Sequence, residues 1–253
     1  MKTEWDYSKL ADAYIKRPNY STEALDAMFD IMSLDVGMSV CDVGAGVGHL
    51  TIELASKGFI VNAVEPNDEM RRNGIERTKK YNNIKWSIGT GENTGMKDKT
   101  FSAVTFGSSF NVCNQNKTLI ESKRIVKESG YFACMWNHRD ITDKHQSNIE
   151  SIIKKYVPQY DYGNRREDQY NFLRDSGFFK TITYINADTV HTQNKDDCVE
   201  AWRSHGTLHR QAGNNFYKII DEIEGYLTKN SLNNIQIPYN TKIWLGKFKH
   251  LPS

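Results

Sequence analysis

The chain has 253 residues, of which 33 are basic and 31 acidic, so its formal net charge is +2. This length suits one large α/β domain and leaves little room for a second independent core. The balanced charge, with no block of like charges, excludes the basic footprint of a nucleic-acid-binding or membrane-surface protein. No apolar run approaches the ~20 residues of a membrane span, and the charged first residues do not resemble a signal peptide, so a cytoplasmic location is expected.

Hydrophobic periodicity divides the chain into helices and strands. In the first 35 residues, apolar positions recur every three or four residues with a break at Pro18, which predicts two short helices. From residue 39 to 136, apolar runs such as SVCDV and FIVNAV alternate with amphipathic segments. This alternation predicts an α/β fold with a doubly wound, mostly parallel sheet covered by helices on both faces. Gly58 and Gly130 stand where two of these helices are expected to end.

The alternation becomes less regular after Trp136. Helices are expected around 143–156 and 166–176, followed by a strand at 179–185. Residues 187–236 are expected to be mostly helical, and residues 239–248 have the alternation of a closing strand. The less regular part is typical of lids or caps inserted around a sheet.

The strongest motif is VCDVGAGVGHLT, which runs from Val40 to Thr51. An apolar strand leads directly into a glycine-rich turn and then into a helix. Glycines let the backbone of such a turn approach a ligand closely, and the helix N-terminus presents N–H groups to it. The turn alone is a weak indication, because a plain β-to-α connection can carry the same residues.

A carboxylate strengthens the motif: Glu65 follows the next apolar run, 19 residues after Gly46. At the end of a second strand it can accept both hydroxyls of an adenosine ribose, a group common to nicotinamide cofactors and S-adenosylmethionine. A dinucleotide fingerprint requires a third glycine where this chain has His49. Asp42, just before the first glycine, can accept a methionine ammonium directly or through water. These details favour S-adenosylmethionine as the cofactor.

Five segments in the correct order resemble the class I S-adenosylmethionine-dependent methyltransferases. DVGAGVGHLT resembles their first motif, and AVEPNDEM resembles their acid-Pro-x-x-x-Met segment. GTGENTGMKDKTFSAVTFGSSFN resembles their third-strand loop and fourth strand, and KTLIESKRIVKESGYFACMWNHRD their next helix and fifth strand. The leader ADAYIKRPNY resembles the opening of one small-molecule branch. The resemblance covers most of the chain and implies a seven-stranded, Rossmann-like sheet with N-terminal helices and a helical cap.

The resemblance also implies which residues hold the cofactor. Pro66 and Met70 would border the adenine, while Glu65 holds the ribose. The family often has an aspartate near the adenine where this chain has Thr90, so contacts are expected at the two residues that follow it. The complete expected set is Tyr14, Arg17, Asp42, Gly44, Ala45, Gly46, Leu50, Glu65, Pro66, Met70, Gly91, Glu92, Gly107 and Ser108.

The N-terminal helices have two possible roles. Tyr14 and Arg17 can close over the methionine end of the cofactor as a lid, or they can only cap and pack the helices. The expected organisation is one domain over 1–253, with a helical lid at 1–36 and a cofactor-binding core at 37–140. The remaining residues, 141–253, would complete the sheet and carry an acceptor cap at about 187–236.

The methyl acceptor is expected on the other side of the cofactor. His138 and Arg139 follow the fifth expected strand, and Arg203, His205 and His209 lie where the resembling enzymes place a variable acceptor cap. A histidine can remove a proton from a hydroxyl, and an arginine can hold an anionic group. The alternatives are a solvated helix face for the cap cluster and a structural role for His138.

No metal site is expected. His205 and His209 have the spacing of a metal-binding pair on a helix, but the segment HGTLH lacks the glutamate of the zinc-protease motif and has no third ligand nearby. The four cysteines are far apart and have no zinc-site spacing.

The expected function is therefore methyl transfer from S-adenosylmethionine to a small molecule, foremost at an oxygen. No nucleic-acid or membrane partner is expected, and the protein would be a monomer or homodimer. Two alternatives stay open: a methyltransferase acting on RNA or protein, and a protein that binds the cofactor without turnover.

Overall fold

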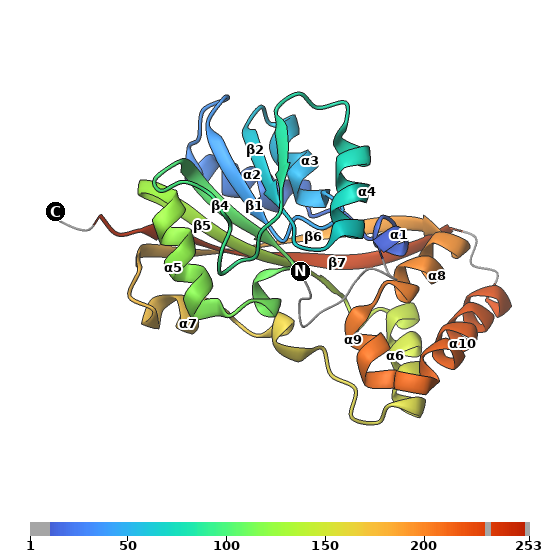
Figure 1. Ribbon diagram of the computed structural model, residues 1–253. Coiled ribbons are helices and arrows are strands. Elements are labelled where there is room, and N and C mark those ends of the chain that lie inside the picture. Colours follow the sequence, from blue (N-terminus) through green and yellow to red (C-terminus); the bar gives the residue numbers. More distant parts are fainter. Residues whose placement is uncertain (1–10, 231–233, 251–253) are drawn as a thin grey trace.

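The computed structural model describes residues 11–230 and 234–250, so the first ten residues of the expected lid lie outside the described residues. A seven-stranded sheet with the order β3-β2-β1-β4-β5-β7-β6 forms its centre (Figure 1). β7 is antiparallel to its neighbours β5 and β6, whereas the pairs on the other side of β5 are parallel. The strands are β1 (Ser39–Val43), β2 (Ile60–Val64), β3 (Ile84–Ser87), β4 (Phe101–Gly107), β5 (Val126–Arg139), β6 (Phe179–Asn194) and β7 (Asn234–Phe248).

Helices cover both faces of the sheet, which confirms the doubly wound α/β prediction. Val40 and Cys41 are neighbours in β1, yet they enter two different buried cores, because successive side chains of a strand point to opposite faces. Helices α2 (Thr22–Met32) and α3 (His49–Ser56) pack into the first core, and α5 (Gln115–Ile125) and α7 (Tyr170–Asp175) into the second.

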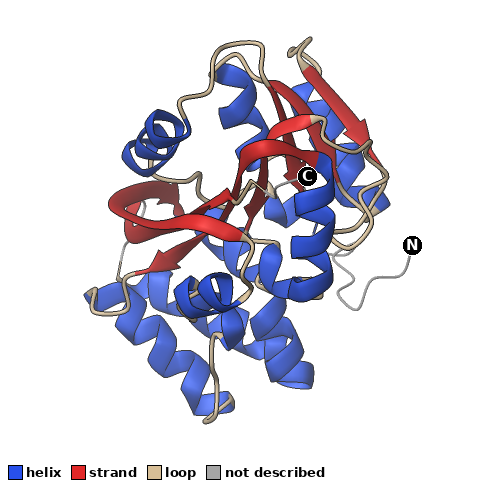
Figure 2. Cartoon of the chain, turned by 90° about the vertical axis from the view of Figure 1, so that its left-hand side faces the viewer, coloured by secondary structure: helices blue, strands red, loops and turns tan. Residues whose placement is uncertain are grey.

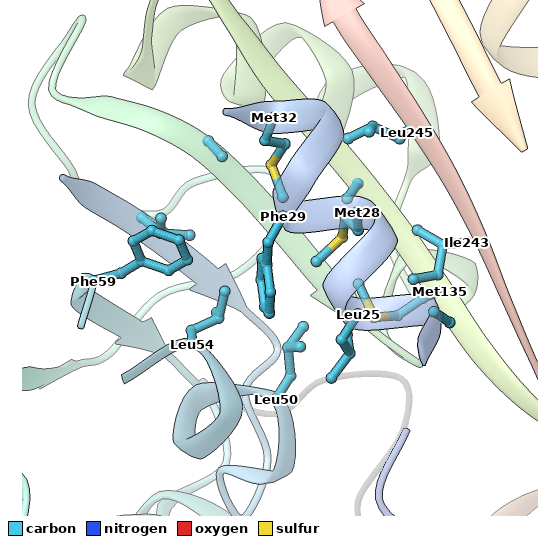
Figure 3. Packing of buried hydrophobic residues seen from close by; sticks show 14 of the residues in the cluster. Leu25, Met28, Phe29, Met32, Leu50, Leu54, Phe59, Met135, Ile243 and Leu245 are labelled. Carbon is cyan, nitrogen blue, oxygen red and sulfur yellow. The ribbon is translucent and has the colours of Figure 1, made fainter. Parts of the chain in front are cut away.

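The face of α2 that meets the sheet shows why this leader segment is helical. Leu25, Met28, Phe29 and Met32 are spaced by three or four residues and therefore lie on one side of the helix. Figure 3 shows them packed toward side chains of α3, β5 and β7, with the Phe29 ring edge-on to Phe59 at a centroid distance of 5.5 Å. This packing anchors the leader beside the ends of the strands that form the site.

Four helices form a separate cap with its own core. They are α6 (Lys144–Tyr156), α8 (Lys195–Arg203), α9 (Gly206–Ala212) and α10 (Phe216–Lys229). Ile235 and Ile237 of β7 belong to the same buried cluster. Figure 1 shows the group at one end of the long strands β6 and β7, and Figure 2 shows it below the sheet. The cap is thus built on the part of these two strands that extends past their neighbours.

The sequence-based prediction of helix at 187–236 is wrong at both ends. Residues 187–194 belong to β6, and residues 234–236 belong to β7. The two strands pair from Phe179 with Phe248 to Asn194 with Asn234, with one irregularity between Phe179 and Thr181. The polar segment ADTVHTQN is therefore a strand because its backbone pairs with β7, not because it buries an apolar face.

Gly58 and Gly130, the two expected helix ends, have different outcomes. Gly58 follows α3 with φ +88°, as expected for a glycine after a helix. The helix expected to end at Gly130 ends at Ile125 instead, and Gly130 lies inside β5. A Cβ at Gly130 would be 2.7 Å from the carbonyl oxygen of Ser102, so the glycine permits close approach of two strands at an irregularity in their pairing.

The remaining described helices are α1 (Ala11–Tyr14), in the leader, and α4 (Asp68–Thr78), after β2. Within residues 11–230 and 234–250, the longest apolar helices fall short of what a bilayer crossing requires.

Candidate active site

A cavity of about 740 Å³ lies at the C-terminal ends of β1, β2, β4 and β5. This is the edge where open α/β sheets bind ligands, and the volume is in the range of small-molecule sites. The leader and the cap also contribute lining residues. Every residue of the expected cofactor set lines this cavity: Tyr14, Arg17, Asp42, Gly44, Ala45, Gly46, Leu50, Glu65, Pro66, Met70, Gly91, Glu92, Gly107 and Ser108.

The glycine turn is held by its own backbone N–H groups. Gly44 and Ala45 donate to the carbonyl oxygen of Val64 at 2.8 and 3.1 Å. Gly46 donates to Glu65 Oε2 at 2.8 Å. These three N–H groups therefore bond to the end of β2 and are not available as the phosphate donors that a dinucleotide turn supplies. The arrangement agrees with a cofactor that has no pyrophosphate.

Gly44 is required by both conformation and space. Its φ is +66°, and a Cβ at this position would lie 2.4 Å from Cβ of Ser109. Ser109 cannot easily move away, because its hydroxyl donates to the carbonyl oxygen of Val43 at 2.6 Å. The turn and the loop after β4 are thus packed together directly behind the cavity.

Glu65 is buried, with 7 % of its surface exposed, and both of its carboxylate oxygens are oriented by backbone. Oε2 accepts from Gly46 N, and Oε1 accepts from Asn67 N at 2.9 Å. Burial raises the pKa of this carboxyl, and the two backbone donors oppose the rise. Each oxygen has a further lone pair, so the carboxylate can accept two more donors from a ligand.

Asp42 is a second buried carboxyl in the cavity wall. Thr51 Oγ1 donates to its Oδ2 at 2.6 Å, and Thr105 Oγ1 donates to its Oδ1 at 3.1 Å. Burial raises the pKa of the Asp42 carboxyl to about 6. Two neutral hydroxyls only partly replace water around the charge, so a cationic ligand group would stabilise the ionised form.

The leader roofs the cavity and is attached on two sides. Arg17 lies over the Tyr14 ring at 4.0 Å, and its Nε donates to Ser204 Oγ in the cap at 3.1 Å. The ring of His49, at the start of α3, contacts the carbonyl oxygen of Tyr14 through Nε2 at 3.2 Å. Burial lowers the pKa of His49 to about 4, so this ring is neutral at physiological pH.

The structure separates the five expected catalytic residues into two groups. His138, Arg139 and His205 line the cavity, whereas Arg203 and His209 do not. The prediction that Arg203 and His209 lie in the acceptor pocket is wrong, because their side chains lie on the outer side of the cap. Arg203 pairs with Glu200 and lies 3.8 Å from Glu224, and exposed His209 packs edge-on against Phe216 at 4.7 Å.

His205 has a defined hydrogen-bonding role. It is buried, caps the N-terminus of α9 by accepting from Leu208 N at Nδ1 over 3.2 Å, and stacks on Trp202 at 5.3 Å. Because Nδ1 accepts, the proton of the neutral ring resides on Nε2. His205 is therefore arranged as a hydrogen-bond donor rather than as a general base.

Several cavity residues were not singled out from the sequence. Tyr20 hydrogen-bonds to Ser108 at 3.1 Å, and Arg166 Nη2 donates to the carbonyl oxygen of Arg139 at 3.1 Å. Tyr162 and Tyr239 complete the cap side. Tyr20 ends the leader segment ADAYIKRPNY and could have been found there. Arg166 and Tyr162 lie in or beside a short 3-10 turn that has no motif to mark it.

The fold and the cavity together define a class I methyltransferase-type α/β protein. A family model described as a methyltransferase domain matches residues 41–134, which span β1 to the middle of β5. The match thus covers the central region of the chain, which carries the glycine turn and Glu65 of the cavity wall.

Curated relatives agree with this assignment. An uncharacterized methyltransferase of Mycobacterium tuberculosis is 29% identical over 127 residues, which are 49% of this chain and 48% of that protein. The ubiquinone/menaquinone biosynthesis C-methyltransferase of Caulobacter vibrioides is 29% identical over 165 residues, 60% of this chain and 65% of that protein. The chain thus spans about half the length of the first curated relatives it matches.

Solved structures share the whole fold. A proposed type II methyltransferase from Anaeromyxobacter dehalogenans has a TM-score of 0.66 at 14% identity, over 92% of this chain and 99% of that one. Phosphoethanolamine N-methyltransferase 2 of Haemonchus contortus, solved with S-adenosyl-L-methionine, has a TM-score of 0.55 at 14% identity, over 96% and 57%. At these identities the likeness shows the class I methyltransferase fold.

Proposed function

We propose that this chain is an S-adenosylmethionine-dependent methyltransferase that methylates a small molecule, foremost at an oxygen. The observation that carries the proposal is one shared cavity. Two buried carboxyls, Asp42 and Glu65, line it beside the glycine turn, while His138, Arg139 and His205 line it from the fifth strand and the cap. A cofactor pocket and an acceptor pocket thus open into each other.

The cofactor side fits S-adenosylmethionine group by group. Glu65 accepts the two ribose hydroxyls, and Asp42 accepts the methionine ammonium. Pro66, Met70, Gly91 and Glu92 border the adenine. When bound, S-adenosylmethionine supplies an electrophilic methyl group on a cationic sulfur.

The leader contributes to the same site. Arg17 uses three of its five N–H groups in the bonds to Tyr14 and Ser204, so further donors remain for the cofactor carboxylate. Closing over that end excludes water from the reacting atoms. This supports the division into a lid at 1–36, a core at 37–140 and a cap-bearing remainder at 141–253.

Catalysis by this chain would consist mainly of positioning. The chain would hold an acceptor oxygen in line with the methyl group that bound S-adenosylmethionine would supply, with the electron pair of the carbon–sulfur bond left on sulfur. A hydroxyl acceptor also has to lose a proton, and His138 at the end of β5 is the proposed base. An acceptor that is already an oxyanion needs no base.

The test has two steps. Calorimetry should detect binding of S-adenosylmethionine and S-adenosylhomocysteine and no binding of NAD or NADP. Labelled S-adenosylmethionine is then incubated with fractionated small-molecule and macromolecular extracts. Label in an alkali-labile ester or in an ether supports oxygen as the acceptor atom. Label on carbon would match the quinone C-methyltransferase relatives and would overturn the proposal of methylation at oxygen.

Two alternatives are outcomes of the same test. Label in RNA or protein would indicate a macromolecular methyltransferase, and cofactor binding without any transfer would indicate a binding protein. The proposal includes a cytoplasmic protein that is a monomer or homodimer with no nucleic-acid or membrane partner.

A further inference from the structure

The charges that line the cavity are divided between its two sides. The three acidic side chains, Asp42, Glu65 and Glu92, all come from the first part of the sheet, around the glycine turn. Arg17 of the leader is assigned to the cofactor carboxylate, and the later segments contribute two further arginines, Arg139 at the end of β5 and Arg166 in the turn before α7. The cationic cofactor matches the acidic side, so the basic side is left to the second ligand.

Arg139 and Arg166 are neighbours. Arg166 Nη2 donates to the carbonyl oxygen of Arg139 at 3.1 Å. The guanidinium of Arg139 lies 3.9 Å above the Trp202 ring, and that of Arg166 lies 3.8 Å above the Tyr162 ring. Stacking occupies the face of a guanidinium and leaves its in-plane N–H groups for planar anions.

Neither arginine has an internal counter-ion in the described part of the chain. No carboxylate of residues 11–230 and 234–250 is paired within 4.0 Å with either one. Glu150 is close enough to interact electrostatically with Arg166, but it is already bound to Lys154 at 2.7 Å and to the Tyr162 hydroxyl at 3.0 Å. In addition, Nε of Arg139 and Nε of Arg166 are both buried without a hydrogen-bond partner.

Such an arrangement is costly for the protein by itself. A partly buried cation loses water, and an unpaired buried donor loses a hydrogen bond. Arg203 and Arg124 illustrate the usual solution, because each pairs with two carboxylates. An arginine pair that lines a cavity with unsatisfied donors is typical of a site whose partner is a ligand.

We propose that Arg139 and Arg166 bind an anionic oxygen group, a carboxylate or a phosphate, of the methyl acceptor. This rests on the proposed function, since it identifies the basic side of the cavity as the acceptor side. His205 lies beside the pair, stacked on the same Trp202. An apolar quinone would leave the donors of the two arginines unpaired, so the acceptor class differs from that of the quinone enzymes.

The test uses the full chain saturated with S-adenosylhomocysteine and four probes: inorganic phosphate, phenyl phosphate, benzoate and the neutral benzyl alcohol. Titration calorimetry should show that at least one anionic probe binds at least tenfold more tightly than benzyl alcohol. Phenyl phosphate and benzoate distinguish phosphate from carboxylate preference. Equal affinity of all four probes would overturn the proposal.

Variants locate the binding. Arg139→Gln and Arg166→Gln should each weaken the preferred anion at least tenfold, as expected for the loss of charge-assisted hydrogen bonds. Arg139→Lys and Arg166→Lys keep the charge without the fork and should bind with intermediate affinity. Arg203→Gln, on the outer side of the cap, is the matched control and should bind like the parent. Folded Gln variants with unchanged affinity contradict the assignment.

Failure of the proposed function can be distinguished from failure of the anion-binding proposal. If S-adenosylhomocysteine does not bind, the cofactor assignment fails, and the anion titrations are repeated without it. Glu65→Gln should weaken S-adenosylhomocysteine while leaving the affinity for the anionic probe unchanged. An anion signal lost in that variant as well would overturn the proposed separation of the two sides.

Discussion

Arg17 and Ser204 join the leader to the cap across the top of the cavity. Nε of Arg17 donates to Ser204 Oγ, and Nη2 donates to the carbonyl oxygen of Ser204, both at 3.1 Å. Ser204 caps the C-terminus of α8, where a positive charge is favourable. Lys16 supports this contact through an ion pair with Asp197 at 2.8 Å. The lid and the cap therefore form one roof.

The first prediction concerns this roof. Arg17→Ala should speed hydrogen exchange at least tenfold in residues 11–20, because its two hydrogen bonds to Ser204 and its one to Tyr14 are lost. Ser204→Ala removes only the hydroxyl partner and keeps the carbonyl, so its effect should be smaller. Cofactor should slow exchange at 11–20 in the parent. An unchanged rate in Arg17→Ala would return these residues to a packing role.

The second prediction is a pH dependence from Asp42. Its pKa is about 6 in the folded protein, so the ionised form that accepts an ammonium is lost as the pH falls through 6. Affinity for S-adenosylhomocysteine should fall about tenfold per pH unit below that value. Asp42→Asn should bind more weakly at pH 8 and show a flat profile. The same slope in parent and variant would assign the dependence to another group.

The Asp42 carboxyl also affects the folding stability of the cofactor-free protein. This effect favours low pH, whereas cofactor binding favours high pH. A folded pKa raised above the unfolded value means that its contribution is most favourable below pH ~4 and is lost as the pH rises through about 6. Asp42→Asn should therefore stabilise the cofactor-free protein at pH 8, by up to about 3 kcal/mol, and not at pH 4. Denaturant unfolding at the two pH values measures this. Equal effects at both values would contradict it.

The third prediction concerns Glu65, which orders the glycine turn and is the proposed acceptor of the ribose hydroxyls. In Glu65→Gln the amide nitrogen cannot accept from Gly46 or Asn67, so one backbone donor loses its partner at a cost of about 1–3 kcal/mol. Affinity for S-adenosylhomocysteine should drop at least tenfold, with a smaller decrease in melting temperature. Unchanged affinity would mean that the ribose lies elsewhere.

The fourth prediction separates the two cap histidines. His205→Asn keeps a good helix N-cap but removes the imidazole from the cavity wall, so the protein should stay folded while methyl transfer falls by something like 10²-fold, as expected when the acceptor is positioned less well. His209→Ala, whose side chain is exposed outside the cavity, should retain full turnover. Activity assays with the acceptor found in the extracts, together with circular dichroism, test both. Full activity in His205→Asn would remove it from the site.

The fifth prediction tests the packing behind the turn. Gly44→Ala places a Cβ at φ +66° and 2.4 Å from Ser109 Cβ, so the variant should be strongly destabilised. Adding Ser109→Gly removes the steric conflict but not the conformational strain. The double variant should therefore recover part of the lost stability in thermal unfolding. No recovery would mean that strain alone is responsible.

Local patterns in the sequence were sufficient to predict the sheet core and the residues on the proposed cofactor side of the cavity. Asp42, Gly44, Gly46 and Glu65 stand at the ends of two neighbouring apolar runs, and parallel strands bring such ends to one edge of a sheet. The residues are close in space because they are close to strand ends in the chain. That is why Asp42, the glycine turn and Glu65 line one cavity, whereas Tyr14 and Arg17 reach it through the packing of the leader.

The acceptor side was decided only by the tertiary structure. Residues 187–194 are a strand because β7 pairs with them, and the local sequence pattern does not indicate this pairing. Arg203, His205 and His209 share one helical region, yet only His205 faces the cavity, since the orientation of α8 and α9 depends on the cap core. Arg166 becomes a neighbour of Arg139 through one long-range hydrogen bond. Short-range periodicity predicts most of the secondary structure, whereas contacts between distant segments decide the strand at 187–194 and determine which side chains share a site.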